Sequence, residues 1–235
     1  MTNKILIFDL FSDWGQVKKV FTTMSPLSFP FPSRTVIQGI IGAIVGIDKK
    51  INPETFIDEN TNIAIRIINP VKKSVIPHNN IKVTSKSHFS RFNSHKPTNI
   101  EFLKDTKYRV YFSSENLDIY TKLKSQLENH CSIYNISIGI SQCLANFEYI
   151  GEYDYQQIKT KDNVKVSSVF KKKGIIEIDF DDRKVFTVIL PVRMKNDREV
   201  IDYQEYVYEA DGKEIKLKTE YEIIEVNNGE RIVFL

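Results

Sequence analysis

The sequence has few cysteines, and this scarcity limits the kinds of site it can build. Among 235 residues only Cys131 and Cys143 occur, far apart and outside any metal-ligand spacing. We therefore expect neither a disulfide nor a zinc site, and we interpret both residues as ordinary buried thiols of a reducing compartment. The sequence also lacks a glycine-rich phosphate loop, a defensible Ser/His/Asp arrangement and any cofactor motif. It predicts no cofactor and no small-molecule substrate.

Long apolar runs are missing as well. The longest, residues 36–47, is interrupted by Gln38 and falls short of the roughly 20 residues that cross a bilayer. The first ten residues enter a strand-like pattern directly, without the basic region and cleavage site of an export signal. We expect a cytoplasmic protein with no membrane crossing. Hydrophobic residues at 41% and charged residues at 27% are typical of a globular domain.

The charge is unevenly distributed. Residues 1–112 carry 16 Lys and Arg against 8 Asp and Glu, whereas residues 113–235 carry 17 against 22. The net charges of +8 and −5 predict that the first half meets a polyanion. Residues 71–100 are the extreme case, because they have no acidic residue and interleave their cations with His88, Phe89, Phe92 and His95. This pattern favours nucleic-acid binding. A solvated loop is the alternative.

Hydrophobic periodicity predicts a mixed first part. Strands are expected over residues 4–11, 61–69, 107–113 and 145–153, and helices over 34–47 and 115–129, capped by Ser33 and Ser114. This order is that of a ferredoxin-like or RNA-recognition-type domain, placed at residues 1–153. The connection between the second and third strands is too long for an ordinary loop, so we expect an inserted hairpin or mobile arm there.

Residues 154–235 change to short strands separated by charged turns, including Asp211-Gly212 and Asn228-Gly229. We therefore predict an α+β protein whose RNA-recognition-type N-terminal domain precedes a small all-β C-terminal module. Gly39, Gly42 and Gly46 recur at helical spacing in the first predicted helix, where each costs roughly 1 kcal/mol relative to alanine. Close approach of another backbone or of RNA would explain them.

One stretch carries a family resemblance. GQVKKVFTTMSPLSFPFPSRTVIQGIIGAIVGI, residues 15–47, resembles the signature of the CRISPR-associated Cas five family, in a form closest to its type I-B branch. EFLKDTKYRVYF (101–112), SIGISQCLANFEYIGE (137–152) and the closing GERIVFL agree with it. The loop that in relatives often reads aromatic-Arg-Lys has Val17-Lys18-Lys19 here, which puts base-specific contact at that point in doubt.

The resemblance implies a non-catalytic subunit of a CRISPR surveillance (Cascade) complex that caps the 5′ handle of the guide RNA (crRNA). It implies a thumb-like hairpin, here at about residues 71–106, packed against a backbone subunit, and a flank against the large subunit, which reads target DNA. Contact with the flank of the target DNA is a further possibility.

The resemblance and the side-chain chemistry together predict the RNA-binding residues. Cations can pair with phosphates, hydroxyl and amide groups can bind a 2′-hydroxyl, and a helix N-terminus offers free backbone N–H groups. Trp14 or Phe21 could stack on a base. The predicted set is Lys18, Lys19, Thr22, Thr23, Ser25, Arg34, Gln38, Gly39, Lys82, Lys86, His88, Arg91 and Lys96.

Two other functions stay open. In a metal-independent ribonuclease, as in the type I-C branch, His88 and His95 with Lys86, Lys96 or Tyr108 would supply the chemistry. In a purely structural adaptor, the basic segment would contact protein, and binding would not weaken steeply with salt. The acidic cluster Asp179, Asp181 and Asp182 is interpreted as a solvated turn rather than a metal site, since Arg183 and Lys184 follow it.

Overall fold

The computed structural model describes residues 3–22, 24–56, 61–83, 85–86, 94–159 and 162–235. Within these ranges the fold is mixed and mostly β. Helix α1 spans Arg34–Val45, α3 spans Leu117–Glu128, and the one-turn α2 spans Asn52–Thr55. None of these helices has the length and apolarity needed to span a membrane.

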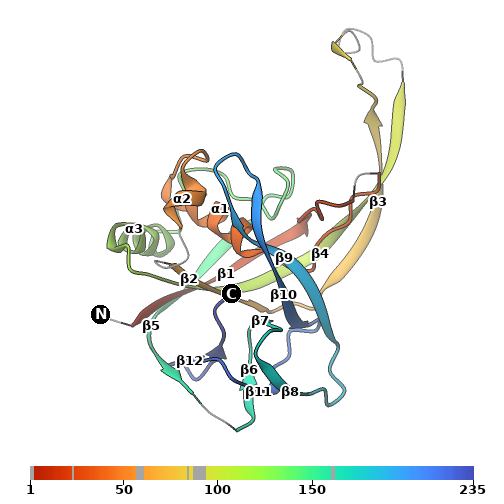
Figure 1. Ribbon diagram of the computed structural model, residues 1–235. Coiled ribbons are helices and arrows are strands. Elements are labelled where there is room, and N and C mark those ends of the chain that lie inside the picture. Colours follow the sequence, from red (N-terminus) through yellow and green to blue (C-terminus); the bar gives the residue numbers. More distant parts are fainter. Residues whose placement is uncertain (1–2, 23, 57–60, 84, 87–93, 160–161) are drawn as a thin grey trace.

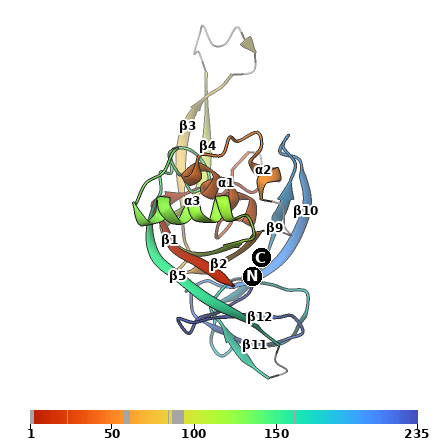
Figure 2. The ribbon, with the colours of Figure 1, turned by 90° about the vertical axis from the view of Figure 1, so that its left-hand side faces the viewer.

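A large antiparallel sheet forms the centre of the molecule (Figures 1 and 2). Its strands lie in the order β13-β12-β5-β1-β4-β2, and β3 pairs with a separate stretch of β4. These strands are β1 (Lys4–Gly15), β2 (Thr61–Ile67), β3 (Lys72–Ile81), β4 (His95–Ser114), β5 (Asn146–Ile158), β12 (Ile223–Val226) and β13 (Arg231–Ile232).

Both faces of this sheet are covered, as the continuous apolar run of β1 predicts. Leu6, Phe8 and Leu10 pack in the main core with α1 and α3, which lie on one face. Ile5 and Ile7 alternate to the other face and pack with residues of β12 and β13. The face of the central sheet opposite α1 and α3 is therefore partly covered by the C-terminal strands.

The long connection predicted between the second and third strands contains a hairpin arm, which we define as the paired residues 72–81 and 95–104 (Figure 1). Its pairing runs from Lys72 opposite Lys104 to Ile81 opposite His95. Strand β4 then continues into the central sheet, so one 20-residue strand joins the arm to the core. At the junction Asp105 has a φ of 52°, in the left-handed region.

The remaining strands form two three-stranded sheets, β7-β10-β9 and β6-β11-β8. Leu190 and Tyr206 of the first sheet belong to the main core, and the predicted boundary at residues 153 and 154 falls inside β5. The strands are β6 (Val164–Val166), β7 (Phe170–Lys171), β8 (Ile175–Asp179), β9 (Val185–Met194), β10 (Val200–Glu209) and β11 (Ile215–Thr219).

Helix ends follow local chemistry. The prediction of Ser33 as N-cap of α1 is confirmed, since its hydroxyl accepts a hydrogen bond from the Val36 amide. The helix ends at Val45 because Gly46 adopts φ 79°, the left-handed C-cap that glycine tolerates best. The prediction of Ser114 as the second cap is wrong: Asn116 caps α3 by accepting from Ile119, while Ser114 accepts from the Asn116 amide outside the helix.

Candidate nucleic-acid interface

Residues 17–22 and 24–29 form a turn of chain that follows β1, and we call these residues the loop. The Phe29 amide donates to Val17 O at 2.8 Å, and the Lys19 amide donates to Leu27 O at 2.8 Å. Thr22 closes its tip, donating to Lys19 O at 2.8 Å and accepting from the Leu27 amide at 3.1 Å. The Thr22 hydroxyl therefore shapes the loop, which reduces its availability for a 2′-hydroxyl.

The loop is fixed to the base of the arm by a small polar cluster. Glu101 accepts from the Ser28 amide at 2.9 Å and from Lys73 Nζ at 2.8 Å, and Lys73 also donates to Ser28 O at 3.0 Å. The Glu101 amide donates to Pro26 O at 2.9 Å. Burial alone would raise the pKa of Glu101, but Lys73 and the Ser28 amide outweigh it and lower that pKa. Loop and arm base thus form one surface.

Predicted cations and exposed apolar groups lie together on this surface. Lys18 is exposed, and Lys19 Nζ lies 5.8 Å from the centre of the Phe29 ring. Lys96 Nζ lies 3.7 Å from Met24 Sδ, which connects the arm to the loop tip. Phe21 is 71% exposed, so its ring is accessible from solvent, unlike the aromatic rings of the core. Ser25, Lys82 and Lys86 are also exposed.

This combination suits a single-stranded nucleic acid. Lysine ammonium groups bind phosphates with little sequence preference, and an exposed ring accepts any base by stacking. Such contacts weaken with salt because each neutralised phosphate releases counterions.

Arg34 is not part of this surface. It is 4% exposed, and its guanidinium donates to Thr61 O at 2.7 Å and to Leu235 O at 3.2 Å. These two hydrogen bonds hold the C-terminal segment and β2 against α1. We therefore interpret Arg34 as a structural residue, which corrects its prediction as a phosphate ligand.

Two aromatic residues considered in the sequence, Tyr108 and Trp14, also make contacts within the protein. Tyr108, a candidate for ribonuclease chemistry, is buried and donates to Pro30 O at 3.0 Å, and burial raises its pKa far above neutrality. Trp14 packs edge-on against Phe102 at 6.2 Å with Lys104 Nζ 6.0 Å from its ring. Thr23, His88 and Arg91 lie outside the described residues.

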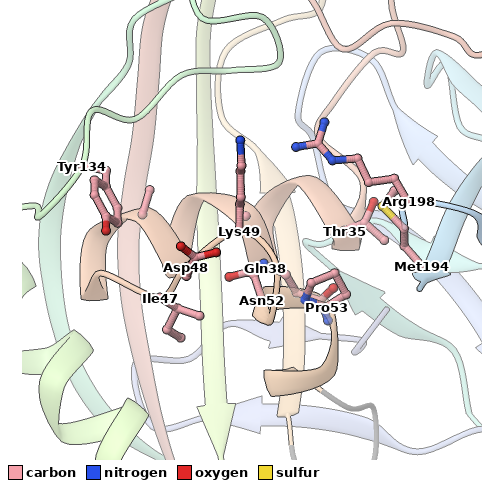
Figure 3. A pocket seen from close by; sticks show the side chains of 12 residues that line it. Thr35, Gln38, Ile47, Asp48, Lys49, Asn52, Pro53, Tyr134, Met194 and Arg198 are labelled. Atoms are coloured by element: carbon pink, nitrogen blue, oxygen red, sulfur yellow. The ribbon is translucent and has the colours of Figure 1, made fainter. Parts of the chain in front are cut away.

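Gln38 and Gly39 line a second feature, a pocket of about 510 Å³ beside α1 (Figure 3). Gln38 donates its Nε2 to Phe56 O at 3.0 Å, which fixes its side chain. The pocket also includes Lys49, Tyr134 and Arg198, which the sequence did not single out. The adjacent Lys49 and Lys50 after α1 are a local pattern that could have indicated an anion-binding site. Tyr134 and Arg198 come from distant segments, so no local pattern connects them to α1.

Within the described ranges, no group of three or more His, Cys, Asp or Glu side chains is arranged to hold a metal ion. Asp179 pairs with Lys216 at 3.4 Å, and Asp181 and Asp182 both have positive φ in the turn after β8. The prediction that both cysteines are buried is confirmed for Cys143, whose thiol pKa is raised by that burial, and is wrong for Cys131, which is exposed.

Comparison with known proteins places the fold. No protein-family model and no curated protein matches the sequence. Among solved structures, a CRISPR protein from Archaeoglobus fulgidus superposes with a TM-score of 0.62 at 14% identity, covering 98% of this chain and 99% of that one. A chain of a CRISPR RNA-guided surveillance complex gives 0.55 at 12% identity over 89% and 91%. The chain has the fold of these CRISPR-associated proteins.

Proposed function

We propose that the chain is a non-catalytic subunit of a type I CRISPR surveillance complex that binds and caps the 5′ handle of the guide RNA. The observation that carries the proposal is the joined surface of loop and arm: the loop carries Lys18, Lys19 and the exposed Phe21 and Met24, and Lys96 of the arm contacts Met24. We infer a ferredoxin-like, RNA-recognition-type core within the Cas five family, closest to its type I-B branch.

Three findings support this proposal. The fold is shared with CRISPR-associated proteins, one of them a chain of an RNA-guided complex. The central sheet orders its strands β5-β1-β4-β2 with α1 and α3 on one face, an arrangement typical of ferredoxin-like domains. Because β12 and β13 cover part of the other face, RNA is expected on the loop and arm instead.

The arm suits a protein partner as well as RNA. Val75 on its base and Ile81 near its tip are 60% and 48% exposed. Apolar side chains on a protruding hairpin are typical of a surface completed by assembly. We infer that the arm packs on a backbone subunit, with the large subunit and the flank of the target DNA near the body.

We propose no catalytic role. Of the residues considered for cleavage, Tyr108 is held in the interior and Lys96 contacts Met24, so neither is positioned as a general base or acid by the described structure. His95 lies exposed opposite Ile81 in the arm.

The test uses purified protein and 5′-labelled CRISPR repeat RNA in chelator, read on native and denaturing gels from the same tube. We expect retention of handle-bearing RNA without a specific cut. Lys18→Ala/Lys19→Ala should weaken retention and reduce the salt dependence, by roughly 0.7 in log–log slope per lost phosphate contact.

The matched control is Lys122→Ala/Lys165→Ala, which removes two exposed lysines from α3 and β6. Wild-type affinity and salt dependence in Lys18→Ala/Lys19→Ala would contradict the proposed surface. A single discrete cut abolished by His95→Ala would make the chain a processing ribonuclease instead.

A further inference from the structure

The pocket beside α1 is lined by Gly39, and the described structure would leave room for a larger side chain there. Gly39 lies in the interior of α1, where glycine costs roughly 1 kcal/mol relative to alanine. No heavy atom lies within 4 Å of the position that a Cβ would take, so the space above Gly39 is open. Gly42 differs, because the Asn52 side chain occupies that position there. No contact within the described chain therefore accounts for the glycine at position 39.

Two cations reach this opening from separate elements. Lys49 follows the end of α1, and Arg198 comes from the turn between β9 and β10. Figure 3 shows both side chains extending to the same side of α1. In that turn Lys195, not Arg198, pairs with Glu199. Arg198 has a φ of 71°, an uncommon backbone conformation for a residue with a side chain, so the turn holds it at some cost in free energy.

The pocket wall adds an aromatic ring. Tyr134 is 52% exposed, and its backbone amide donates to Ala43 O at 3.0 Å, which ties its segment to α1. Thr35 and the fixed Gln38 place polar groups on the same helix face. The lining also includes the carboxylate of Asp48, so Lys49 and Arg198 leave the pocket with a net positive charge. A flat ring, an open glycine and two cations around about 510 Å³ match the needs of a nucleotide, within the size range of ligand pockets.

We propose that this pocket receives one unstacked nucleotide of a single-stranded RNA, with its phosphate at Lys49 and Arg198 and its base over Gly39 beside Tyr134. The inference rests on the proposed function and extends it to a second contact, separate from the loop and arm. A protein carboxylate would use the two cations but would not need the open helix face or the ring.

The test uses the full chain and repeat RNAs that each carry 2-aminopurine at one position of the handle. In wild-type protein we expect a fluorescence change concentrated at one position. Gly39→Leu, which fills the opening with a good helix former, should abolish that signal and weaken binding roughly tenfold, within the range measured for one stacked base. Lys49→Ala/Arg198→Ala should weaken binding and lower the salt dependence, whereas Lys122→Ala/Lys165→Ala should not.

The outcomes separate this inference from the proposed function. If the pocket variants bind with wild-type affinity and an unchanged 2-aminopurine signal while Lys18→Ala/Lys19→Ala loses binding, the pocket inference is wrong and the function stands. If the pocket variants keep RNA but lose assembly with a purified complex subunit, the pocket takes protein, which also overturns the inference. Unchanged RNA binding in every variant would remove the proposed interface.

Discussion

The Ser28 amide donates a hydrogen bond of 2.9 Å to the carboxylate of Glu101, 73 residues further along the chain. This contact, with Lys73 on the same carboxylate, fixes the loop to the base of the arm. The position of the predicted RNA-binding lysines therefore depends on one ionised carboxyl group.

Protonation of Glu101 should loosen this attachment. Because its pKa is lowered in the folded protein, ionised Glu101 contributes stability above its ordinary pKa of about 4.3, and that contribution is lost as the pH falls through the lower folded value. The unfolding free energy of Glu101→Gln should fall less steeply than wild type below about pH 4.3. Denaturant titrations at several pH values measure this difference. The exposed Glu177→Gln serves as control, and parallel curves for wild type and Glu101→Gln would contradict the assignment.

Arg34→Ala should destabilise the fold rather than act on RNA directly. Its removal leaves the carbonyls of Thr61 and Leu235 without their donor, which we expect to cost about 3 kcal/mol. Urea unfolding measures the loss, and Arg34→Lys should recover part of it. A variant as stable as wild type but defective in RNA binding would return Arg34 to the interface.

Gly39 and Gly42 should respond unequally to alanine. Gly39→Ala meets open space and should stabilise the protein by up to roughly 1 kcal/mol, whereas Gly42→Ala must displace the end of the Asn52 side chain and should gain less. Adding Asn52→Ala to Gly42→Ala should remove that difference. Unfolding free energies of the four proteins decide the point, and equal effects at both glycines would show that Asn52 does not fill the space at Gly42.

Asp9 and Arg109 should be coupled in stability. Asp9 is 2% exposed and accepts two hydrogen bonds from Arg109, at 2.8 and 3.2 Å. Asp9→Asn should cost about 3 kcal/mol, because Arg109 and Lys107 lose a shared carboxylate in a partly buried site, while Arg109 keeps its ion pair with Glu230. A double-mutant cycle with Arg109→Gln measures the coupling. Additive single effects would mean that Glu230 alone satisfies Arg109.

Local patterns predicted the local features of this fold. Ser33 and the apolar face of residues 34–45 define α1 by interactions within a few residues, and the alternating burial of β1 follows from its own sequence. The hairpin arm was expected because the connection between the predicted strands at residues 61–69 and 107–113 is longer than an ordinary loop.

Features that depend on distant contacts could not be predicted in this way. The carbonyl groups that accept hydrogen bonds from Arg34 lie 27 and 201 residues away in the sequence. Without those contacts, its position next to a helix N-terminus suggested an accessible anion site. The pocket likewise combines α1 with Tyr134 and Arg198, and only the folded chain brings these segments together.

The arm continues the ladder of the central sheet. Asp105 takes a left-handed conformation at its base, with its carbonyl accepting from Asn69 Nδ2 at 2.9 Å and its carboxylate 3.4 Å from Lys72 Nζ. Strand β1 pairs with β4 on both sides of this residue, through Ser12 opposite Thr106 and Trp14 opposite Lys104. The ten residues of β3 extend the arm by about 33 Å, so a partner bound at the far end of β3 would be held at a set distance from the body.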